Sequence, residues 1–205
     1  PGKPTLSSAG HGGLTQVQEK EETTHLSVVD EEGNAVSVTT TINGAYGSRV
    51  IVGGAGFILN NEMDDFSAKP GAPNLYGLLG TESNAIQAEK RMLSSMTPTI
   101  VLKNKKPYLV LGTPGGSTIP TSVFQTIINI LEFDLPVEDA INKPKFHHQW
   151  QPDIIYIEKD FSESLKSNLE EMGYKFKKRK PIGRTEVIKI SDYGVEAVGD
   201  KRGDD

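Results

Sequence analysis

The sequence predicts an α+β fold in which antiparallel strands and helices pack in layers. Two strand-like segments flank the polar turn at residues 31–34, and a second pair flanks residues 103–106, which is the pattern of two β-hairpins. The second hairpin leads directly into residues 119–133, where Val123 and Ile127 recur at helical spacing. Hairpins that lead into long helices favour stacked layers of sheet and helix.

The chain is expected to begin with a flexible tail at residues 1–22, followed by one domain at residues 23–205. The tail is rich in Gly, Pro, Ser, Thr and Gln, and three glutamates close it. It holds too few large apolar residues to be ordered by burial. Order is therefore expected to begin close to Thr23.

The first hairpin is expected to pair residues 25–30 with residues 35–42. Side chains alternate between the two faces of a strand. Along the second strand one face therefore carries valines, while Ser37, Thr39 and Thr41 share the other. A strand face lined by hydroxyl groups is unusual for packing and is the first indication of a functional site.

The remaining elements follow in order. Residues 43–56 and 69–74 are rich in turn-forming residues and are expected to be loop. Short helices are predicted at residues 136–142 and 161–172, the second closed by Gly173. Further strands are expected at residues 154–158, 186–190 and 195–198.

Composition and spacing disfavour several classes of function. The chain has 22 Lys and Arg against 27 Asp and Glu, a net charge of −5, so no basic footprint indicates nucleic-acid binding. No segment approaches the roughly 18 apolar residues of a membrane span. The absence of cysteine excludes disulfides, thiolate metal sites and a cysteine nucleophile. His147 and His148 are interpreted as structural and the basic run at 175–180 as a solvated face.

A glycine-rich loop at residues 112–118 joins a strand to a helix. Gly115 and Gly116 allow successive backbone N–H groups to point the same way at the start of the helix. That arrangement suits a phosphate or a developing oxyanion, and the absence of a Walker lysine disfavours phosphate. On its own, the loop fits a tight strand-to-helix turn at least as well.

Two polar clusters could bind a charged ligand. Glu62 and Asp65 are three residues apart and would share one face of a helical turn, where they could hold an ammonium group or a metal ion. Ser94 and Ser95 lie between apolar anchors and could donate to a carboxylate. A solvated loop and ordinary strand-end hydrogen bonding are the structural alternatives.

No Gly-x-Ser-x-Gly motif marks a serine nucleophile in this sequence. A threonine is therefore the nucleophile to examine. Thr23 and Thr24 lie at the junction between the tail and the first strand. A threonine hydroxyl needs an adjacent base. Its own α-amine, with a pKa of about 8, supplies one once the preceding peptide bond is cut.

Several longer motifs resemble the small subunit of the γ-glutamyltranspeptidase family. They run from Thr23 nearly to the C-terminus, in the family's order and spacing. The matching segments are Thr23-Thr24-His25, Gly33-Asn34-Ala35-Val36, Asn60-Asn61-Glu62-Met63-Asp64-Asp65-Phe66-Ser67, Lys69-Pro70-Gly71, Leu93-Ser94-Ser95-Met96-Thr97-Pro98-Thr99-Ile100, Pro114-Gly115-Gly116-Ser117 and Phe146-His147-His148-Gln149-Trp150.

The resemblance implies a four-layer αββα sandwich of the N-terminal-nucleophile hydrolases and a precursor that cuts itself between Glu22 and Thr23. It implies a γ-glutamyl transferase or hydrolase that acts on glutathione and related compounds through a γ-glutamyl-enzyme on Thr23. The implied partners are the large subunit, the γ-glutamyl substrate and amino-acid or peptide acceptors, with no cofactor, metal or nucleic acid and no membrane segment in this chain. The implied location is periplasmic or extracellular.

The family's roles fall on residues already singled out. By this resemblance Thr41 would orient Thr23, and the N–H groups of Gly115 and Gly116 would hold the oxyanion. The substrate's zwitterionic head would lie between acceptors for its α-ammonium and hydroxyl donors for its α-carboxylate. These are Asn43, Glu62 and Asp65 for the ammonium, and Ser94 and Ser95 for the carboxylate.

The sequence also departs from the family pattern. Thr40, Met92 and Thr118 stand where many members have tyrosine, proline and arginine, and residues 199–202 replace a Ser-Asp-Pro-Arg. An arginine that grips the α-carboxylate comes from the family's large subunit, so this chain alone is expected to be incomplete. A cephalosporin acylase-like amidohydrolase, disfavoured by the acidic pair, and a catalytically silent structural module remain as alternatives.

Overall fold

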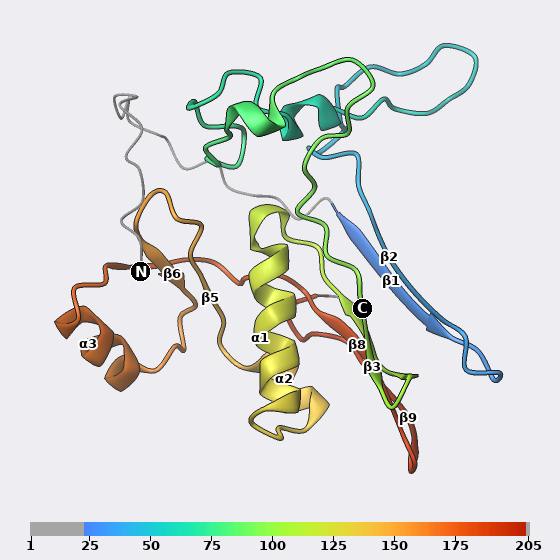
Figure 1. Cartoon of the computed structure of the whole chain (residues 1–205), viewed down its shortest axis with the longest axis vertical. Coiled ribbons are helices and arrows are strands. Elements are labelled where there is room, and N and C mark those ends of the chain that lie inside the picture. The colour runs from blue at the N-terminus through green and yellow to red at the C-terminus, as the bar shows by residue number, and fades with distance from the viewer. Residues whose placement is uncertain (1–22, 204–205) are drawn as a thin grey trace.

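The computed structural model describes residues 23–203, so the tail expected at residues 1–22 lies outside the described residues. A four-stranded antiparallel sheet is central to the fold (Figure 1), in the strand order β3-β4-β8-β9. Helices cover one face of this sheet and a separate hairpin covers the other. The strands are β3 (Thr99–Lys103), β4 (Lys106–Gly112), β8 (Glu186–Ser191) and β9 (Gly194–Val198).

The helical layer consists mainly of α1 (Ile119–Leu131) and α2 (Val137–Asn142). Along α1, Ile119, Val123 and Ile130 are buried at helical spacing, which explains why this segment packs on the sheet as a helix. Both helices lie within two residues of the predicted bounds. The core between helices and sheet consists of Leu109, Leu111, Val123, Ile130, Val137, Ala140, Ile141 and Val187.

The first hairpin pairs β1 (Thr24–Val29) with β2 (Ala35–Thr40), as predicted, and Thr24 lies opposite Thr40. Its hydroxyl face is turned toward the central sheet, where the Ser37 hydroxyl donates to the carbonyl of Leu111 at 3.0 Å. Its apolar face is the exposed one. This exposed face carries Leu26, Val28, Val36 and Val38, which are 56%, 45%, 50% and 43% exposed.

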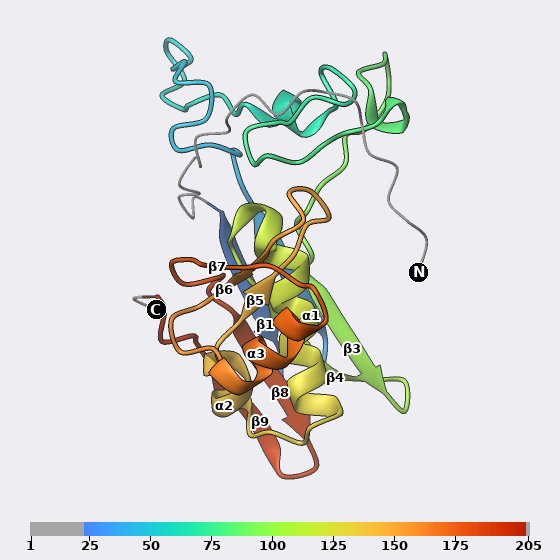
Figure 2. The same cartoon turned by 90° about the vertical axis from the view of Figure 1, so that its left-hand side faces the viewer.

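A smaller mixed sheet lies beside the helices (Figure 2), and the sequence pattern predicted only part of it. Its strands are β5 (Phe146–His147), β6 (Ile155–Ile157) and β7 (Phe176–Lys178), and α3 (Glu163–Glu171) connects the last two. Strand β7 pairs in parallel with β6. The predicted solvated basic run therefore contains a strand whose lysines are exposed, and this strand was missed because its three residues lack an alternating apolar pattern.

Residues 41–98 are largely irregular and lie across one end of the two sheets (Figure 1). They include two short 3-10 turns, η1 (Glu62–Asp65) and η2 (Glu82–Asn84). The loops predicted at residues 43–56 and 69–74 are confirmed. Among residues 23–203 no helix has the length and apolar character needed to cross a membrane.

Candidate active site

Thr23 lies immediately before β1, at the end of the hairpin that faces the irregular segment. It is buried, at 8% exposed, and its hydroxyl donates to the Thr41 hydroxyl at 3.2 Å. The hairpin register explains this contact, because Thr24 pairs with Thr40 and the next position on each strand is Thr23 and Thr41. The predicted hydroxyl face thus ends in a pair of bonded threonines.

Thr41 also fixes the next polar residue of the site. Its hydroxyl oxygen accepts from the backbone N–H of Asn43 at 2.9 Å. Asn43 has a φ of 70°, which turns the chain away from the strand direction, and its side chain is buried. The Asn43 carboxamide donates to the Asn61 carbonyl and accepts from the Tyr76 hydroxyl at 2.7 Å.

The glycine loop lies across the cavity from the threonine pair. Gly115 and Gly116 have φ values of 136° and 54°, which side-chain-bearing residues rarely adopt. Within the described part of the chain, neither glycine N–H donates to a protein acceptor, so both are available to an incoming oxygen. The Ser95 hydroxyl donates to the carbonyl of Gly116 at 3.1 Å and ties the serine segment to this loop.

One cavity brings most of the predicted residues together. Glu62 and Gly115 are the two predicted site residues that do not line it. Tyr76 lines the cavity too, although no pattern in the sequence marks it as a site residue. The lining residues are Thr23, Thr41, Asn43, Asp65, Tyr76, Ser94, Ser95, Met96, Gly116 and Ile119.

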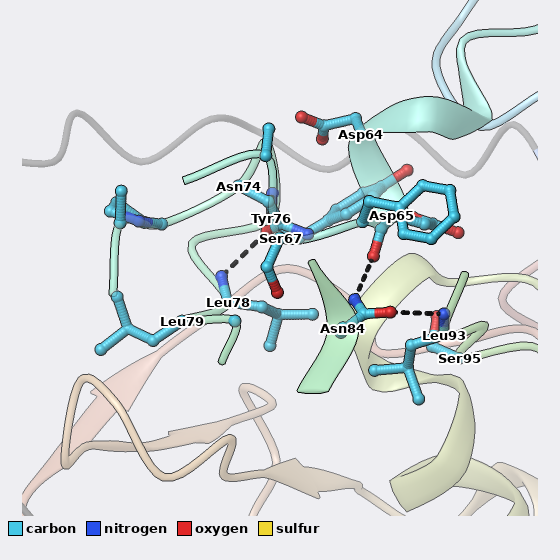
Figure 3. A pocket seen from close by; sticks show the side chains of 15 residues that line it. Asp64, Asp65, Ser67, Asn74, Tyr76, Leu78, Leu79, Asn84, Leu93 and Ser95 are labelled. Carbon is cyan, nitrogen blue, oxygen red and sulfur yellow. Dashed lines mark hydrogen bonds between the residues drawn. The ribbon is translucent and has the colours of Figure 1, made fainter. Parts of the chain in front are cut away.

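A second, larger cavity shares three of these lining residues: Asp65, Tyr76 and Ser95 (Figure 3). It extends between η1 and the turn around Asn74. The Asn84 side chain supports its wall, since it donates to the carbonyl of Asp65 at 2.7 Å and accepts from the N–H of Leu93 at 3.0 Å. The acidic turn and the serine segment are therefore held together through one amide.

The surroundings of Glu62 and Asp65 disfavour the ionised forms of both carboxyl groups. Burial raises the pKa of Glu62, and the charge of Asp65 raises it further. Burial and then the charge of Asp64 raise the pKa of Asp65. One oxygen of Glu62 is buried and has no hydrogen-bond partner among residues 23–203. A bound cation would compensate both features, because it favours the ionised carboxylates.

The two serines differ in their environment. Ser94 is exposed, and its hydroxyl accepts from the N–H of Met96 at 3.2 Å, whereas Ser95 is half-buried and bonded to the glycine loop. Both line the first cavity opposite the acidic side. The cavity thus offers acceptors on one side and hydroxyl groups on another, which is the polarity that an amino-acid zwitterion requires.

Neither histidine of the pair His147 and His148 enters this cavity. His147 is buried, and its ring nitrogens bond to Thr121 at 2.9 Å and to Gln149 at 3.0 Å. The exposed His148 bonds to Asp153 at 3.1 Å. Within residues 23–203 no group of three or more His, Cys, Asp or Glu side chains is arranged to hold a metal ion.

The site combines the buried Thr23 hydroxyl, directly before strand β1, with two glycine N–H groups that have no protein acceptor among residues 23–203. With two face-to-face sheets and an outer helical layer, this defines the class of N-terminal-nucleophile hydrolases, whose full fold is an αββα sandwich. A cephalosporin acylase from Bacillus halodurans has this fold too, at 26% identity and a TM-score of 0.74, covering 88% of this chain and 32% of its own.

Closer relatives identify the family. The sequence model of gamma-glutamyltranspeptidase matches residues 3–205, and the chain belongs to that family. It is 49% identical over 176 residues to the glutathione hydrolase proenzyme of Escherichia coli, covering 86% of this chain and 30% of that protein. A Helicobacter pylori gamma-glutamyltranspeptidase T380A mutant is 51% identical with a TM-score of 0.84, covering 88% of this chain and 100% of that chain.

The chain spans about a third of the length of the curated relatives that it matches, since the shares covered are 30% and 34% for the first two. Its match to the Helicobacter pylori structure nevertheless covers the whole of the compared chain. The threonine pair and the glycine loop both lie within residues 23–203 of this chain.

Proposed function

We propose that this chain is the nucleophile-bearing part of a γ-glutamyl transferase or hydrolase that acts on glutathione and other γ-glutamyl compounds. The observation that carries the proposal is the cavity in which the bonded Thr23–Thr41 pair faces Gly116 and, on its other sides, Asp65 and the two serines. The names of the relatives, glutathione hydrolase proenzyme and gamma-glutamyltranspeptidase, support it.

The chemistry begins with a cut in the precursor. Hydrolysis of the Glu22–Thr23 amide leaves a carboxylate on Glu22 and a free α-amine on Thr23. The Thr23 hydroxyl then attacks the γ-glutamyl carbonyl, and the α-amine accepts the hydroxyl proton. The N–H groups of Gly115 and Gly116 stabilise the resulting oxyanion, at about 3 kcal/mol per donor in comparable sites.

The tetrahedral intermediate collapses when the leaving amine departs with a proton from the Thr23 ammonium. This leaves a γ-glutamyl ester on the threonine oxygen. Water, or the amine of an amino acid or peptide, then attacks the ester and restores the hydroxyl. Asn43, Glu62 and Asp65 bind the α-ammonium of the glutamyl group, and its α-carboxylate lies by the serine hydroxyls.

The acidic pair separates this proposal from a cephalosporin acylase-like activity. The pKa values of both carboxyl groups are raised, and Asp65 lines the cavity, so a cation bound beside the pair would favour their ionised forms. An α-ammonium group supplies that cation, and a substrate without one would leave the pair uncompensated. The pair therefore favours an α-amino acid head over other amide substrates.

We further propose that the remainder of the precursor, the large subunit, covers the exposed apolar face of the β1–β2 hairpin. This face lies opposite the one that contacts the central sheet, where a fourth layer would pack. On the family resemblance we also propose a periplasmic or extracellular location, which fractionation of the producing cells would test.

The experiment is carried out on the full-length precursor. Release of p-nitroaniline from γ-glutamyl-p-nitroanilide is measured with and without glycylglycine, and self-cleavage is followed by intact mass. Thr23→Ala is expected to abolish cleavage and to lower turnover by more than about 10³-fold. The matched control is Thr24→Ala, since Thr24 is exposed on the opposite face.

Normal cleavage of the Thr23→Ala precursor would overturn the assignment of the nucleophile. A wild-type protein that cleaves itself but does not turn over γ-glutamyl-p-nitroanilide would overturn the proposed substrate class. A wild-type chain that keeps residues 1–22 attached would support the silent structural module, because the amine of Thr23 would remain acylated and could not act as a base.

A further inference from the structure

The side-chain amide of Gln149 connects two segments that border the first cavity. Its oxygen accepts from the Ser117 hydroxyl at 3.1 Å, and its nitrogen donates to the carbonyl of Tyr76 at 3.3 Å. Ser117 directly follows Gly116, and Tyr76 lines the cavity. One amide thus connects the glycine loop to the segment at residues 73–79.

The orientation of this amide is fixed by its neighbours. The Gln149 oxygen also faces Nε2 of His147 at 3.0 Å, and the Gln149 nitrogen also donates to the carbonyl of Gln151 at 3.4 Å. A carbonyl oxygen can accept two hydrogen bonds and an NH₂ group can donate two. Both ends of the amide are therefore engaged in this orientation, whereas the flipped amide would set its oxygen against two backbone carbonyls.

The connection continues from Tyr76 to the substrate-binding side of the cavity. The Tyr76 hydroxyl donates to the Asn43 side-chain oxygen at 2.7 Å, and the Asn43 N–H donates to Thr41 at 2.9 Å. The Asn43 oxygen has two lone pairs, so one remains for a ligand ammonium after Tyr76 has used the other. A shift of Tyr76 would remove the donor to this oxygen and leave the carboxamide held only by its bond to the Asn61 carbonyl.

We infer that Gln149 is a positioning residue for γ-glutamyl binding. It holds the backbone of Tyr76 against the glycine loop, so that the Tyr76 hydroxyl orients the Asn43 carboxamide toward the substrate's α-ammonium. The inference rests on the proposed function and adds a residue that touches neither substrate nor reacting atoms. Its effect is expected on substrate binding rather than on attack by Thr23.

The test uses Gln149→Glu in the processed full-length protein. The substitution keeps the size and the acceptor oxygen but replaces the NH₂ donor by an oxygen that faces the carbonyl of Tyr76. The expected result is a rise of about five- to tenfold in KM for γ-glutamyl-p-nitroanilide with kcat within about twofold, as for the loss of one hydrogen bond. Tyr76→Phe is expected to raise KM similarly.

The double variant tests whether the two residues act as one unit. Gln149→Glu with Tyr76→Phe is expected to raise KM no more than the larger single change, because both break the same connection. The matched control is Gln125→Glu, whose amide donates to the carbonyls of Thr121 and Phe146 but does not reach Tyr76. This control is expected to leave KM unchanged.

Multiplicative effects in the double variant, a fall in kcat without a change in KM, or an equal effect of Gln125→Glu would overturn the inference. Amide hydrogen exchange tests the inference independently of enzyme activity. The N–H groups of residues 73–79 should exchange faster in Gln149→Glu than in the wild type. Unchanged exchange would overturn it too. A wild type that does not act on γ-glutamyl substrates contradicts the proposed function instead.

If Gln149→Glu does not yield folded protein, Gln149→Met replaces it. Methionine removes both the donor and the acceptor at nearly constant size, without placing a charge at this position. The same rise in KM and the same faster exchange at residues 73–79 are expected. An unchanged KM in Gln149→Met would contradict the role assigned to the amide.

Discussion

At the scale of single residues, the site depends on hydroxyl groups held by other hydroxyl groups. Thr41 accepts from both the Thr23 hydroxyl and the Asn43 N–H, so one oxygen positions the proposed nucleophile and a proposed ammonium ligand. The alternation predicted for this strand placed Thr41 on the hydroxyl face, and the family resemblance then assigned it the role beside Thr23. The pairing partner of this strand then brought Thr23 beside it.

Thr41→Val removes this acceptor with almost no change in shape. The Thr23 hydroxyl then loses its hydrogen-bond partner, and kcat for γ-glutamyl-p-nitroanilide is expected to fall by about 10- to 100-fold, as for one or two hydrogen bonds. Thr40→Val is the matched control, because Thr40 is exposed on the other face of the same strand. Equal losses in the two variants would contradict the role of Thr41.

The acidic pair predicts how substrate binding depends on pH. Because burial raises the pKa values of Glu62 and Asp65, and the charges of Asp65 and Asp64 respectively raise them further, the empty site holds extra protons at mildly acidic pH. An ammonium ligand favours the ionised pair, so binding releases protons. Affinity should therefore rise as the pH increases from about 4 toward about 7.

This prediction is checked by measuring KM across that pH range. In the wild type KM should fall as the pH rises, and in Glu62→Gln the dependence should become shallower, because one titrating group is gone. The control is Glu82→Gln, which changes an exposed carboxyl on the other 3-10 turn. A wild-type KM that is constant or rises with pH would contradict the ammonium role.

The sequence did not reveal the residues whose role depends on contacts between positions far apart in the chain. Tyr76 and Gln149 are 73 positions apart, and neither lies in a local pattern that marks a site. Gln149 was noted only as part of a family motif. Only the folded chain shows that Gln149 bonds to the cavity-lining Tyr76, because the irregular segment around Tyr76 has no periodicity from which its direction could be predicted.

At the scale of elements, the hairpin is placed by a close approach between β1 and β4. The His25 ring is buried and lies against Gly112, where a Cβ atom would overlap the ring. His25 bonds to Thr39 at 2.8 Å and to Ser27 at 2.9 Å. The inward hydroxyl face is therefore explained in part as the set of partners that a buried imidazole requires.

Gly112→Ala should push the hairpin away from the central sheet. Overpacking of this kind costs about 1–3 kcal/mol, so the denaturation midpoint of the processed protein is expected to fall. Combining it with His25→Ala should cost less than the sum of the two single changes, since the smaller side chain leaves room for the added methyl group. Strictly additive losses would show that the two positions do not meet.

The sequence predicted the type of most elements, including β6, but it missed the two other strands of the β5–β6–β7 sheet. Hairpins and helices carry a strong repeat of apolar residues and were placed to within a few residues. Strands β5 and β7 have two and three residues, too few to show alternation, and each exists because β6 offers it an edge. These strands form because of tertiary contacts, which a local sequence pattern does not predict.

At the scale of the whole molecule, a buried ionic cluster ties the C-terminal segment to the core. Lys145 bonds to Asp200 at 2.9 Å, and Arg202 bonds to Glu158 at 2.6 Å and to Asp200 at 2.9 Å. Burial lowers the pKa of Lys145. Burial acts to raise the pKa of Asp200, but Lys145 and Arg202 outweigh it and hold that pKa below its usual range.

Asp200→Asn leaves the buried ammonium of Lys145 without its ionic partner. Breaking a buried pair in this way costs about 3–5 kcal/mol, which should appear as a lower midpoint in urea. The control is Lys201→Ala, because Lys201 pairs with Glu138 at 2.7 Å with both side chains more than half exposed. The control should change stability by less than about 1 kcal/mol.

Acidification should act on the same cluster. Because the pKa of Asp200 is depressed in the folded protein, its contribution to stability is present above the pKa of an unfolded aspartate, near 4, and is lost as the pH falls through the folded value. The difference in stability between wild type and Asp200→Asn should therefore shrink at low pH. A difference that grows on acidification would contradict this assignment.

The bare valine and leucine side of the β1–β2 hairpin also has a practical consequence for anyone who produces this polypeptide. A solvent-exposed apolar surface of this kind promotes self-association. Recombinant synthesis of this segment by itself is expected to give inclusion bodies. Producing it in the same cell as the proposed large subunit, or fused to it in a single uninterrupted open reading frame, should instead give material suitable for crystallisation.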